Sequence, residues 1–332
     1  METLIIGQGE VRELLPMRGC IKVMREALAA LARGDGIQPL RSVMWLPERV
    51  GALGMMPGYL PGINTLGVKT VTVFPGNAGT EFDSHQGTVM LFDGANGTLK
   101  AVIDATEITA IRTAAVSAVA TDLLAREDAS VMAILGSGVQ AGAHLDAIPL
   151  VRPIGEVRVW SRQGVNARQL ADSKATRDLA VRAVPTVAEA VAGADVVCTT
   201  TASTDPILTG ALLEPGMHIN AVGSSVSSAR ELDAEAMTRS RLFVDRREST
   251  INEAGDFLMA QAEGAVDESD ILAEIGELLI GAADGRREGD DITLFKSLGL
   301  AVEDVAAGEL VYQNALDSGA GTRLDLGGAR LG

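Results

Sequence analysis

A glycine-rich turn between an apolar run and a helical pattern is the feature that most constrains this chain. The strand-like run Val131–Leu135 leads directly into the motif G-x-G-x-x-A. Gly136 permits a tight turn, Gly138 lets a pyrophosphate approach the backbone, and the small Ala141 lets the helix pack on the strand. The N–H groups and the dipole of the helix start favour an anion. The motif therefore predicts a dinucleotide site; an ordinary glycine-rich strand–helix turn is the alternative.

The length and composition fit two domains with a sizeable core. The chain has 332 residues, of which 47% are hydrophobic, and this length is typical of two domains or one large one. No uncharged apolar run reaches the length of a membrane span, and the first ten residues do not resemble a signal peptide. The two cysteines, Cys20 and Cys198, lie in apolar surroundings. They indicate buried, reduced thiols and a cytoplasmic location.

The charge and the scarcity of aromatic residues argue against several classes of partner. A net charge of −16 with 3% aromatic residues lacks the basic surface and the stacking platforms of a nucleic-acid-binding protein. An anionic cofactor must then be captured by local basic residues and helix N-termini. Three histidines without a His/Cys/Asp cluster predict no metal site. No Gly-x-Ser-x-Gly motif or Cys–His pair indicates a nucleophile.

From Ser130 onward, apolar runs alternate with helical patterns, which predicts an α/β fold with a doubly wound parallel sheet. The predicted strands are 131–135, 157–160, 181–184, 196–200, 219–222 and 242–244, and the predicted helices include 140–150, 167–179 and 231–240.

The first 110 residues have a different pattern, typical of a small antiparallel α+β domain. We expect a helix over 17–33 and strands over 38–46, 51–59, 66–74, 87–93 and 100–104. A long helix over 107–125 would join the domains, and a last helix over 302–318 would pack back on the first. The glycine-rich tail 319–332 is expected to be mobile. The predicted domains are 1–118 with 303–332, and 119–302.

Four stretches together resemble the ornithine cyclodeaminase/μ-crystallin family. They are Leu66–Val71, Thr109–Ala115, Gly136–Ala141 and Asn220–Gly223, and the resemblance extends from near Pro39 to near Leu300. It implies a Rossmann domain plus a smaller substrate-binding and dimerisation domain. It also implies a homodimeric NAD(P)-dependent enzyme that acts on imines of α-amino acids. The family includes cyclodeaminases, ketimine and imine reductases, and amino-acid dehydrogenases.

The resemblance assigns the substrate side chains to the first domain. Lys69 interrupts an apolar strand pattern, and a buried ammonium with a lowered pKa is a good proton donor. By resemblance Lys69 is the catalytic or substrate-binding lysine, and Arg41 binds the substrate α-carboxylate. His85, in a polar loop, would line the substrate pocket. The alternatives are an edge lysine that extends its charge to solvent, a surface arginine and a loop histidine without a role.

Arg112 is expected in the first turns of a helix, where a cation opposes the helix dipole. By resemblance it faces the cofactor diphosphate or the substrate carboxylate; the alternative is an exposed, solvated arginine. After the second strand, Ser161 and Arg162 stand where NAD-specific sites usually carry an acid. They favour NADP(H), with NAD(H) possible, unless Arg162 only stacks on adenine. The expected cofactor-binding residues are Arg112, Thr113, Gly136, Gly138, Val139, Gln140, Ser161, Arg162, Gln163, Thr201, Ala202, Val222, Gly223 and Ser297.

The segment after the predicted strand 219–222 departs from the cyclodeaminase pattern. In ornithine cyclodeaminases an aspartate that is thought to activate water stands where this chain has Ser225. The change favours the reductase branch, with Ser225 as a candidate catalytic residue. Glu231, Asp233 and Asp256 are expected to be acids at helix starts. By resemblance, Lys296 and Ser297 lie in the segment that closes near the nicotinamide.

Three functions follow as hypotheses. The first is an NADPH-dependent oxidoreductase that adds hydride to the C=N carbon next to a carboxylate, or in reverse oxidises an L-amino acid. The second is a lyase that cyclises ornithine with loss of ammonia and recycles the cofactor; Asp83 could then replace the missing aspartate. The third is a non-enzymatic protein that binds NADPH and a small ligand. In each case the partner is a small imino or amino acid, with no nucleic acid and no membrane.

Overall fold

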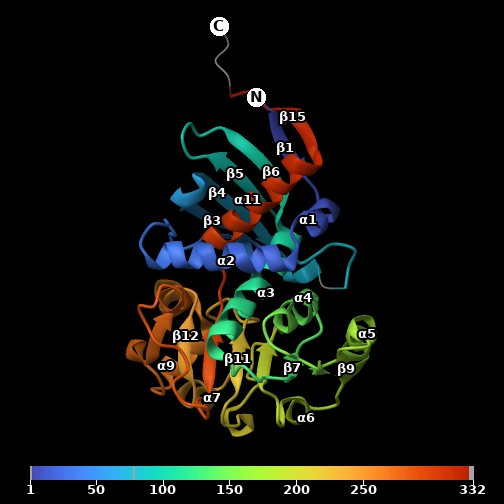
Figure 1. Cartoon of the computed structure of the whole chain (residues 1–332), viewed down its shortest axis with the longest axis vertical. Helices are drawn as coiled ribbons and strands as arrows, with labels where there is room; N and C mark the ends of the chain where they lie inside the picture. The colour runs from blue at the N-terminus through green and yellow to red at the C-terminus, as the bar shows by residue number, and fades with distance from the viewer. Residues whose placement is uncertain (1, 78, 329–332) are drawn as a thin grey trace. The chain divides into compact units, whose positions relative to one another are not determined.

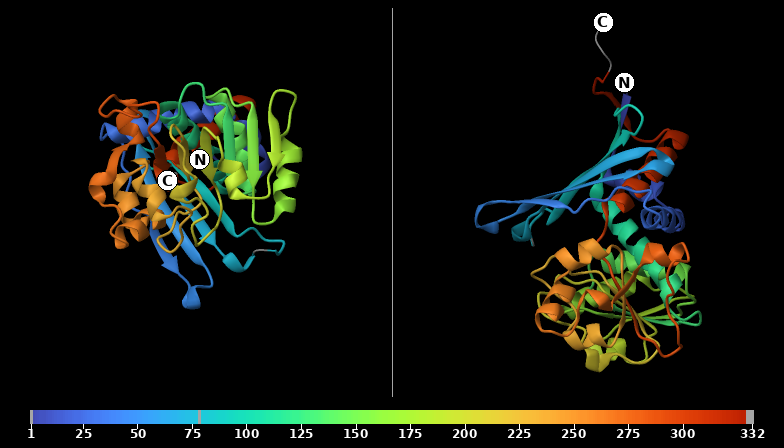
Figure 2. Two further views of the ribbon diagram at one scale, coloured as in Figure 1. Left: turned by 90° about the horizontal axis from the view of Figure 1, so that it is seen from below. Right: turned by 90° about the vertical axis from the view of Figure 1, so that its left-hand side faces the viewer.

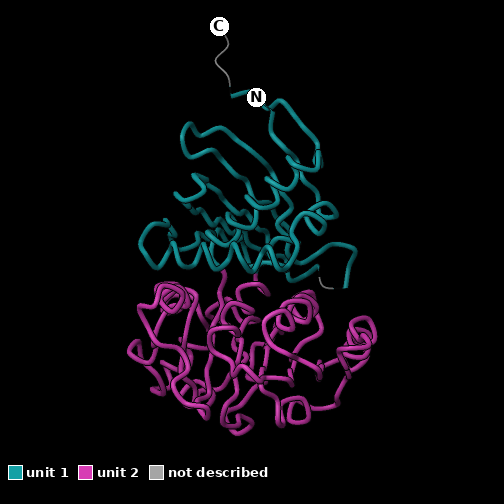
Figure 3. Tube along the Cα trace, in the orientation of Figure 1, with its two compact units in different colours: residues 1–112, 300–332 teal, residues 113–299 magenta. Residues whose placement is uncertain are grey.

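The computed structural model describes residues 2–77 and 79–328. It divides the chain into two compact units: Met1–Arg112 with Leu300–Gly332 is unit 1, and Thr113–Gly299 is unit 2 (Figure 3). The first division falls inside one continuous helix, α3 (Ala105–Leu124). Both divisions fall a few residues before the boundaries expected from sequence. None of the described helices has the length and apolarity that a membrane crossing needs.

In its described residues, unit 1 contains a seven-stranded sheet in the order β15-β1-β6-β5-β4-β3-β2. Neighbouring strands are antiparallel, apart from the parallel pair β1 and β6. Its strands are β1 (Glu2–Ile6), β2 (Ser42–Trp45), β3 (Ala52–Leu60), β4 (Thr65–Val73), β5 (His85–Asp93), β6 (Leu99–Asp104) and β15 (Thr322–Asp325). Its helices beside α3 are α1 (Gln8–Leu14), α2 (Met17–Ala32) and α11 (Ala301–Ser318).

Helix α11 lies against β3, β4 and β5, and α2 packs on α11 (Figure 1). The helix comes unusually close to the sheet because two sheet positions have no side chain. A Cβ at Gly67 would lie 2.5 Å from Val305 Cγ2, and one at Gly58 would lie 3.1 Å from the Ala301 Cβ. The last helix therefore packs on the first domain, as expected, and brings its first turn against the central strands.

The chain ends depart from the expectation. The sequence pattern did not indicate β1, α1 or β15, and the prediction of a mobile tail is wrong for residues 322–325. Strand β15 pairs antiparallel with β1, with Glu2 opposite Asp325 and Ile5 opposite Thr322. This pairing joins the two ends of the chain, so no local pattern reports it. Residues 329–332 of the predicted tail lie outside the described residues.

Unit 2 is described throughout and contains an eight-stranded parallel sheet, in the order β13-β12-β14-β11-β10-β7-β8-β9 (Figure 2). The α/β, doubly wound class is confirmed. The strands are β7 (Val131–Leu135), β8 (Glu156–Trp160), β9 (Ala180–Ala183), β10 (Val196–Thr199), β11 (His218–Ala221), β12 (Arg241–Val244), β13 (Ile271–Glu274) and β14 (Thr293–Lys296). The helices are α4 (Val139–Ala147), α5 (Gly164–Lys174), α6 (Val187–Val191), α7 (Ala234–Thr238), α8 (Arg247–Glu253), α9 (Gly255–Ala262) and α10 (Ile275–Leu279).

Two of these strands, β13 and β14, were not predicted. Each has four residues and carries a polar side chain at its end, so its apolar run is too short to stand out. Strand β14 nevertheless lies between β11 and β12 and is fully buried. Helix α7 is shorter than the predicted helix 231–240, which leaves Glu231 before the helix start.

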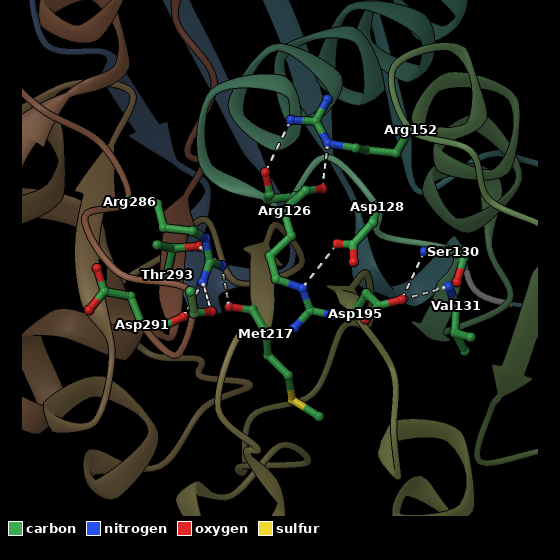
Figure 4. A network of polar contacts seen from close by, with 12 residues as sticks. Arg126, Asp128, Ser130, Val131, Arg152, Asp195, Met217, Arg286, Asp291 and Thr293 are labelled. Carbon is green, nitrogen blue, oxygen red and sulfur yellow. Dashed lines mark hydrogen bonds and ion pairs between the residues drawn. The ribbon is translucent and has the colours of Figure 1, made fainter.

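Arginines close the amino-terminal edge of this sheet (Figure 4). Arg152 donates to the carbonyl oxygens of Arg126 at 2.8 Å and Asp122 at 2.7 Å. Arg286 donates to the Leu124 oxygen at 2.7 Å. The last carbonyls of a helix have no acceptor role within it, so these side chains cap the C-terminus of α3. The carboxyl ends of the strands, where ligands bind in such sheets, lie at the opposite edge.

Candidate active site

The glycine turn after β7 has the geometry of an anion cradle. Gly136 has φ +128°, and a Cβ there would lie 2.6 Å from Thr200 Oγ1, so only glycine fits without strain. Gly138 caps the start of α4, and a Cβ there would meet nothing within 4 Å. Val139 beside it is 68% exposed, whereas Ala141 is fully buried. The backbone at the helix start is thus open to a ligand and fits a diphosphate.

Strand β8 ends in a polar turn without an acid. The Ser161 hydroxyl donates to the Gln163 carbonyl oxygen at 2.7 Å. Arg162 and Gln163 are exposed directly after it. A hydroxyl and an exposed guanidinium at the end of the second strand are compatible with a ribose phosphate.

The loops after β10 and β11 meet at a buried carboxylate. Glu231 accepts hydrogen bonds from the Thr201 backbone N–H at 2.6 Å and from the Gly223 N–H at 2.7 Å. The expectation that Glu231 is a helix-start acid is wrong, because the helix begins later and the side chain turns to these loops. Asp233 does cap α7, through the Ala236 N–H at 2.8 Å. Asp256 lies in the first turn of α9, but it is fully buried.

The two candidate residues at the end of β14, Lys296 and Ser297, differ in whether they are available to a ligand. Lys296 is fully buried and donates to the Ser224 carbonyl oxygen at 2.6 Å and to Asp256 at 2.7 Å. It is therefore a structural lysine, contrary to its expected place in the site. The Ser297 hydroxyl is buried and has no hydrogen-bond partner in the described chain. Such a group is available to a ligand. Ser225 is half-buried beside Ser224.

In unit 1, a cluster of buried charges surrounds Lys69. Its ammonium group lies 3.3 Å from the Asp304 carboxylate, and Lys69 is 5% exposed. Arg112 donates through Nε to Asp304 at 2.9 Å and through Nη1 to Glu303 at 2.7 Å. Arg112 is 3% exposed. The alternatives of a solvent-extended lysine and a solvated arginine are both wrong.

Burial decides the protonation of the lysine. It lowers the pKa of Lys69 to about 8, the charges of Arg112 and Arg41 lower it too, and Asp304 opposes the shift. Lys69 can thus exchange a proton near neutral pH. His85 opens β5 and is exposed, yet packing around the ring lowers its pKa, and the charge of Lys69 lowers it further. Half-buried Arg41 precedes β2. Unit 1 therefore gathers all the predicted substrate-binding residues around Lys69.

Sequence reasoning missed Glu303 and Asp304, the acids that neutralise this cluster. Both side chains are fully buried in the first turn of α11. Asp304 lies 235 residues from Lys69 in the sequence. The sequence spacing therefore does not indicate that the two side chains pair. The available signal was two adjacent acids in an otherwise apolar helix start, where burial requires partners.

The strand order β9-β8-β7-β10-β11-β14, the open glycine turn and the buried lysine define a dinucleotide-dependent class of enzyme. Comparison with known proteins supports this class of enzyme. The sequence model of the ornithine cyclodeaminase/mu-crystallin family matches residues 1–319 of this chain. Ketimine reductase mu-crystallin of Mus musculus is 45% identical over 297 residues, which cover 89% of this chain and 91% of that protein.

Two solved structures are similar over nearly the whole chain. Thermococcus litoralis Delta(1)-pyrroline-2-carboxylate reductase, in complex with NADH and L-proline, has a TM-score of 0.94 at 35% identity and covers 97% of this chain and 100% of its own. An archaeal alanine dehydrogenase dimer with bound NAD has a TM-score of 0.93 at 33% identity, with coverage of 98% and 100%. The chain belongs to the ornithine cyclodeaminase/mu-crystallin family.

Proposed function

We propose that this chain reduces a ketimine whose imine carbon carries a carboxylate, with NADPH as the preferred reductant. In coarser terms, the chain is an enzyme, an NAD(P)-dependent oxidoreductase of the C=N or C–N bond of α-imino or α-amino acids. Its relatives named ketimine reductase and pyrroline-2-carboxylate reductase place it in that class. The observation that carries the finer proposal is Lys69, buried beside Asp304 with a pKa of about 8.

The residues of unit 1 would bind the substrate and handle its proton. A bound reduced nicotinamide supplies a hydride. Arg41 would hold the substrate carboxylate with its planar guanidinium. Lys69 Nζ would donate a proton to the imine nitrogen and then regain one from solvent, which its lowered pKa allows near neutral pH. In the oxidative direction Lys69 would accept the proton of the amine. Arg112 is held by Glu303 and Asp304, so its proposed part is to fix the charge beside Lys69.

Unit 2 would hold the cofactor. The α4 start at Gly138 would receive the diphosphate, and Ser161 with Arg162 would receive a 2′-phosphate, which is why we propose a preference for NADP(H). The two solved relatives carry NADH and NAD, so NAD(H) remains the competing cofactor. The unpartnered hydroxyl of Ser297 is a further candidate contact.

The cyclodeaminase alternative would need a water-activating base other than the residue after Ser224, and Asp83 is the candidate for it. Ser225 replaces the aspartate of the resemblance. The buried acids that follow it in the unit 2 sequence, Glu231, Asp245 and Asp256, all accept hydrogen bonds from backbone N–H groups. These bonds argue against a role for them as bases. The third hypothesis, a binding protein without activity, is set aside because the chain is an enzyme.

We also propose a homodimer formed through unit 1. Edge strand β2 is exposed along its whole length, and Met44 within it is 54% exposed. Met55 on β3 and Leu66 on β4 are each 40% exposed. An apolar face of this kind marks an interaction surface, and the alanine dehydrogenase relative is a dimer. The free, buried cysteines support a cytoplasmic location.

Absorbance at 340 nm tests the function directly. Purified protein is mixed with NADPH, then with NADH, and with a panel of cyclic ketimines and of keto acids plus ammonia or methylamine. Consumption faster with NADPH than with NADH is the expected result. No consumption with any substrate, together with ammonia release from L-ornithine and catalytic NAD⁺, would establish the lyase instead.

A further inference from the structure

Three charged side chains beneath the carboxyl edge of the unit 2 sheet have no exposed surface: Glu231, Asp256 and Lys296. Lys296 pairs with Asp256 at 2.7 Å. Asp256 also accepts from the Glu231 N–H at 2.7 Å and the Leu232 N–H at 3.0 Å. Asp256 is therefore neutralised and fixes the backbone at Glu231. The carboxylate of Glu231 itself points to other partners.

That carboxylate binds the ends of two adjacent strands. Its Oε1 accepts from the Thr201 N–H at 2.6 Å and the Thr201 hydroxyl at 2.7 Å. Its Oε2 accepts from the Thr199 hydroxyl and the Gly223 N–H, both at 2.7 Å. A Cβ at Gly223 would collide with the Thr201 backbone and with Glu231. One side chain thus joins the loop after β10 to the loop after β11, at a position where only glycine fits.

The arrangement is unfavourable for simple packing. Burial raises the pKa of Glu231, although the hydroxyls of Thr199 and Thr201, the charge of Lys296 and the Thr201 N–H oppose the shift. No cation touches the carboxylate in unit 2, because Lys296 is engaged with Asp256 and the Ser224 carbonyl oxygen. A buried acid is tolerated only where hydrogen bonds or charges replace its lost hydration. A buried carboxylate such as that of Glu231 is useful where it holds the backbone of a functional site in one geometry.

The loops it joins belong to one particular half of the cofactor site. In a sheet of this strand order, the glycine turn after β7 receives the diphosphate and the β8 end receives the adenosine ribose. The second mononucleotide half then falls to the ends of β10 and β11. That half would hold the nicotinamide. The loops at Thr201 and Gly223 would then lie next to it, and the unpartnered Ser297 hydroxyl follows β14, the next strand.

We propose that Glu231 is a positioning residue for the nicotinamide half of the cofactor, which acts by holding the backbone at Thr201 and Gly223 in one shape. The proposal rests on the dinucleotide site of the proposed function, but not on which imine is reduced. It assigns no role to Glu231 in binding the adenosine half.

The test compares NADH with ADP, which lacks both the nicotinamide and its ribose, and NADPH with 2′-phospho-ADP. In Glu231→Gln the new amide NH2 faces a backbone N–H, so at least one hydrogen bond is lost. We expect the Kd of the whole dinucleotide, measured by calorimetry on the full chain, to rise on the order of tenfold, with the Kd of the fragment unchanged. The amides of Thr201 and Gly223 should also exchange hydrogen faster.

Arg286→Met is the matched control, because it loosens the same unit at the opposite edge of the sheet. It should lower the thermal midpoint without changing either Kd. Equal weakening of dinucleotide and fragment in Glu231→Gln, or an unchanged dinucleotide Kd in the folded variant, would overturn the proposal.

If Glu231→Gln does not fold, Thr199→Val removes a single donor from the carboxylate. The same selective loss, smaller in size, is then expected, and its absence overturns the proposal. Failure of every imine in the absorbance assay would contradict the proposed function but would leave these binding constants interpretable.

Discussion

The burial of Lys69 explains both its ion pair with Asp304 and its lowered pKa. A lysine that is 5% exposed must either find an anion or lose its proton. Asp304 provides the anion, yet Arg112 shares it, so compensation is incomplete and the pKa falls to about 8. Three residue-scale predictions follow from this site and from the cofactor turn.

The first concerns the Lys69 proton. Lys69→Met should abolish turnover while the Kd of NADPH stays unchanged, because the lysine lies in unit 1 and the cofactor turn in unit 2. Steady-state kinetics and calorimetry measure the two quantities. Equal loss of turnover and of cofactor binding would contradict the assigned role.

The second concerns Asp304. Imine reduction needs protonated Lys69, so kcat/KM should fall as pH rises through about 8. In Asp304→Asn an anion is lost, the charged lysine becomes less favourable, and the midpoint should move to lower pH. Glu309→Gln is the control, since Glu309 lies on the same helix but pairs with Lys100 at 2.6 Å. A midpoint that shifts equally in both variants would show that Asp304 has no special influence.

The third concerns cofactor choice. Arg162→Gln should raise the Kd of NADPH on the order of tenfold, through loss of a charge-assisted bond, and leave that of NADH nearly unchanged. Arg168→Gln, an exposed arginine on α5, should change neither. Parallel weakening of both cofactors by Arg162→Gln would indicate stacking on adenine instead.

At the scale of elements, α3 shows how polar contacts hold a helix within a sheet domain. Its buried Ser117 contacts His144 Nε2 at 2.9 Å, and Thr121 accepts from Asn220 Nδ2 at 2.9 Å. Beyond its end, His218 contacts Thr293 Oγ1 at 3.0 Å. Burial lowers the pKa of His144 to about 4 and of His218 to about 3. Both imidazoles are therefore neutral in the folded state at ordinary pH.

Unit 2 should therefore lose stability in acid. Unfolded histidine takes up a proton below about pH 6.5, whereas these two stay neutral until pH approaches their lowered pKa values. Each should reduce the free energy of unfolding by about 1.4 kcal/mol per pH unit in that window. Urea unfolding followed by Trp160 fluorescence in a Trp45→Phe background measures the slope. His144→Gln should make the slope shallower; an unchanged slope would contradict the assignment.

At the scale of the whole molecule, the exposed face of the unit 1 sheet predicts assembly. Sedimentation velocity should give twice the chain mass for the wild type and a monomer for Met44→Glu with Leu66→Glu, because a buried unpaired charge opposes association. Val165→Glu places the same charge on a residue of unit 2 that is 48% exposed and should leave the dimer intact. A monomeric wild-type protein would contradict the proposed homodimer.

The sequence by itself determined what depends on local pattern. The G-x-G-x-x-A turn, the α/β alternation after Ser130 and the long helices were predictable, because glycine geometry and hydrophobic period are properties of neighbouring residues. The family followed from four short stretches. Buried Lys69 could be picked out because a charge interrupts an apolar strand.

The tertiary structure decided what depends on distant partners. Asp304 meets Lys69 only because α11 returns to the first sheet, and β15 forms only because the chain ends pair. The sequence predicts that Glu231 is an ordinary helix-start acid. In the structure its carboxylate instead accepts hydrogen bonds from the loops at Thr201 and Gly223. A side chain's charge state and role follow from what surrounds it, and those surroundings are set by contacts between segments far apart in the chain.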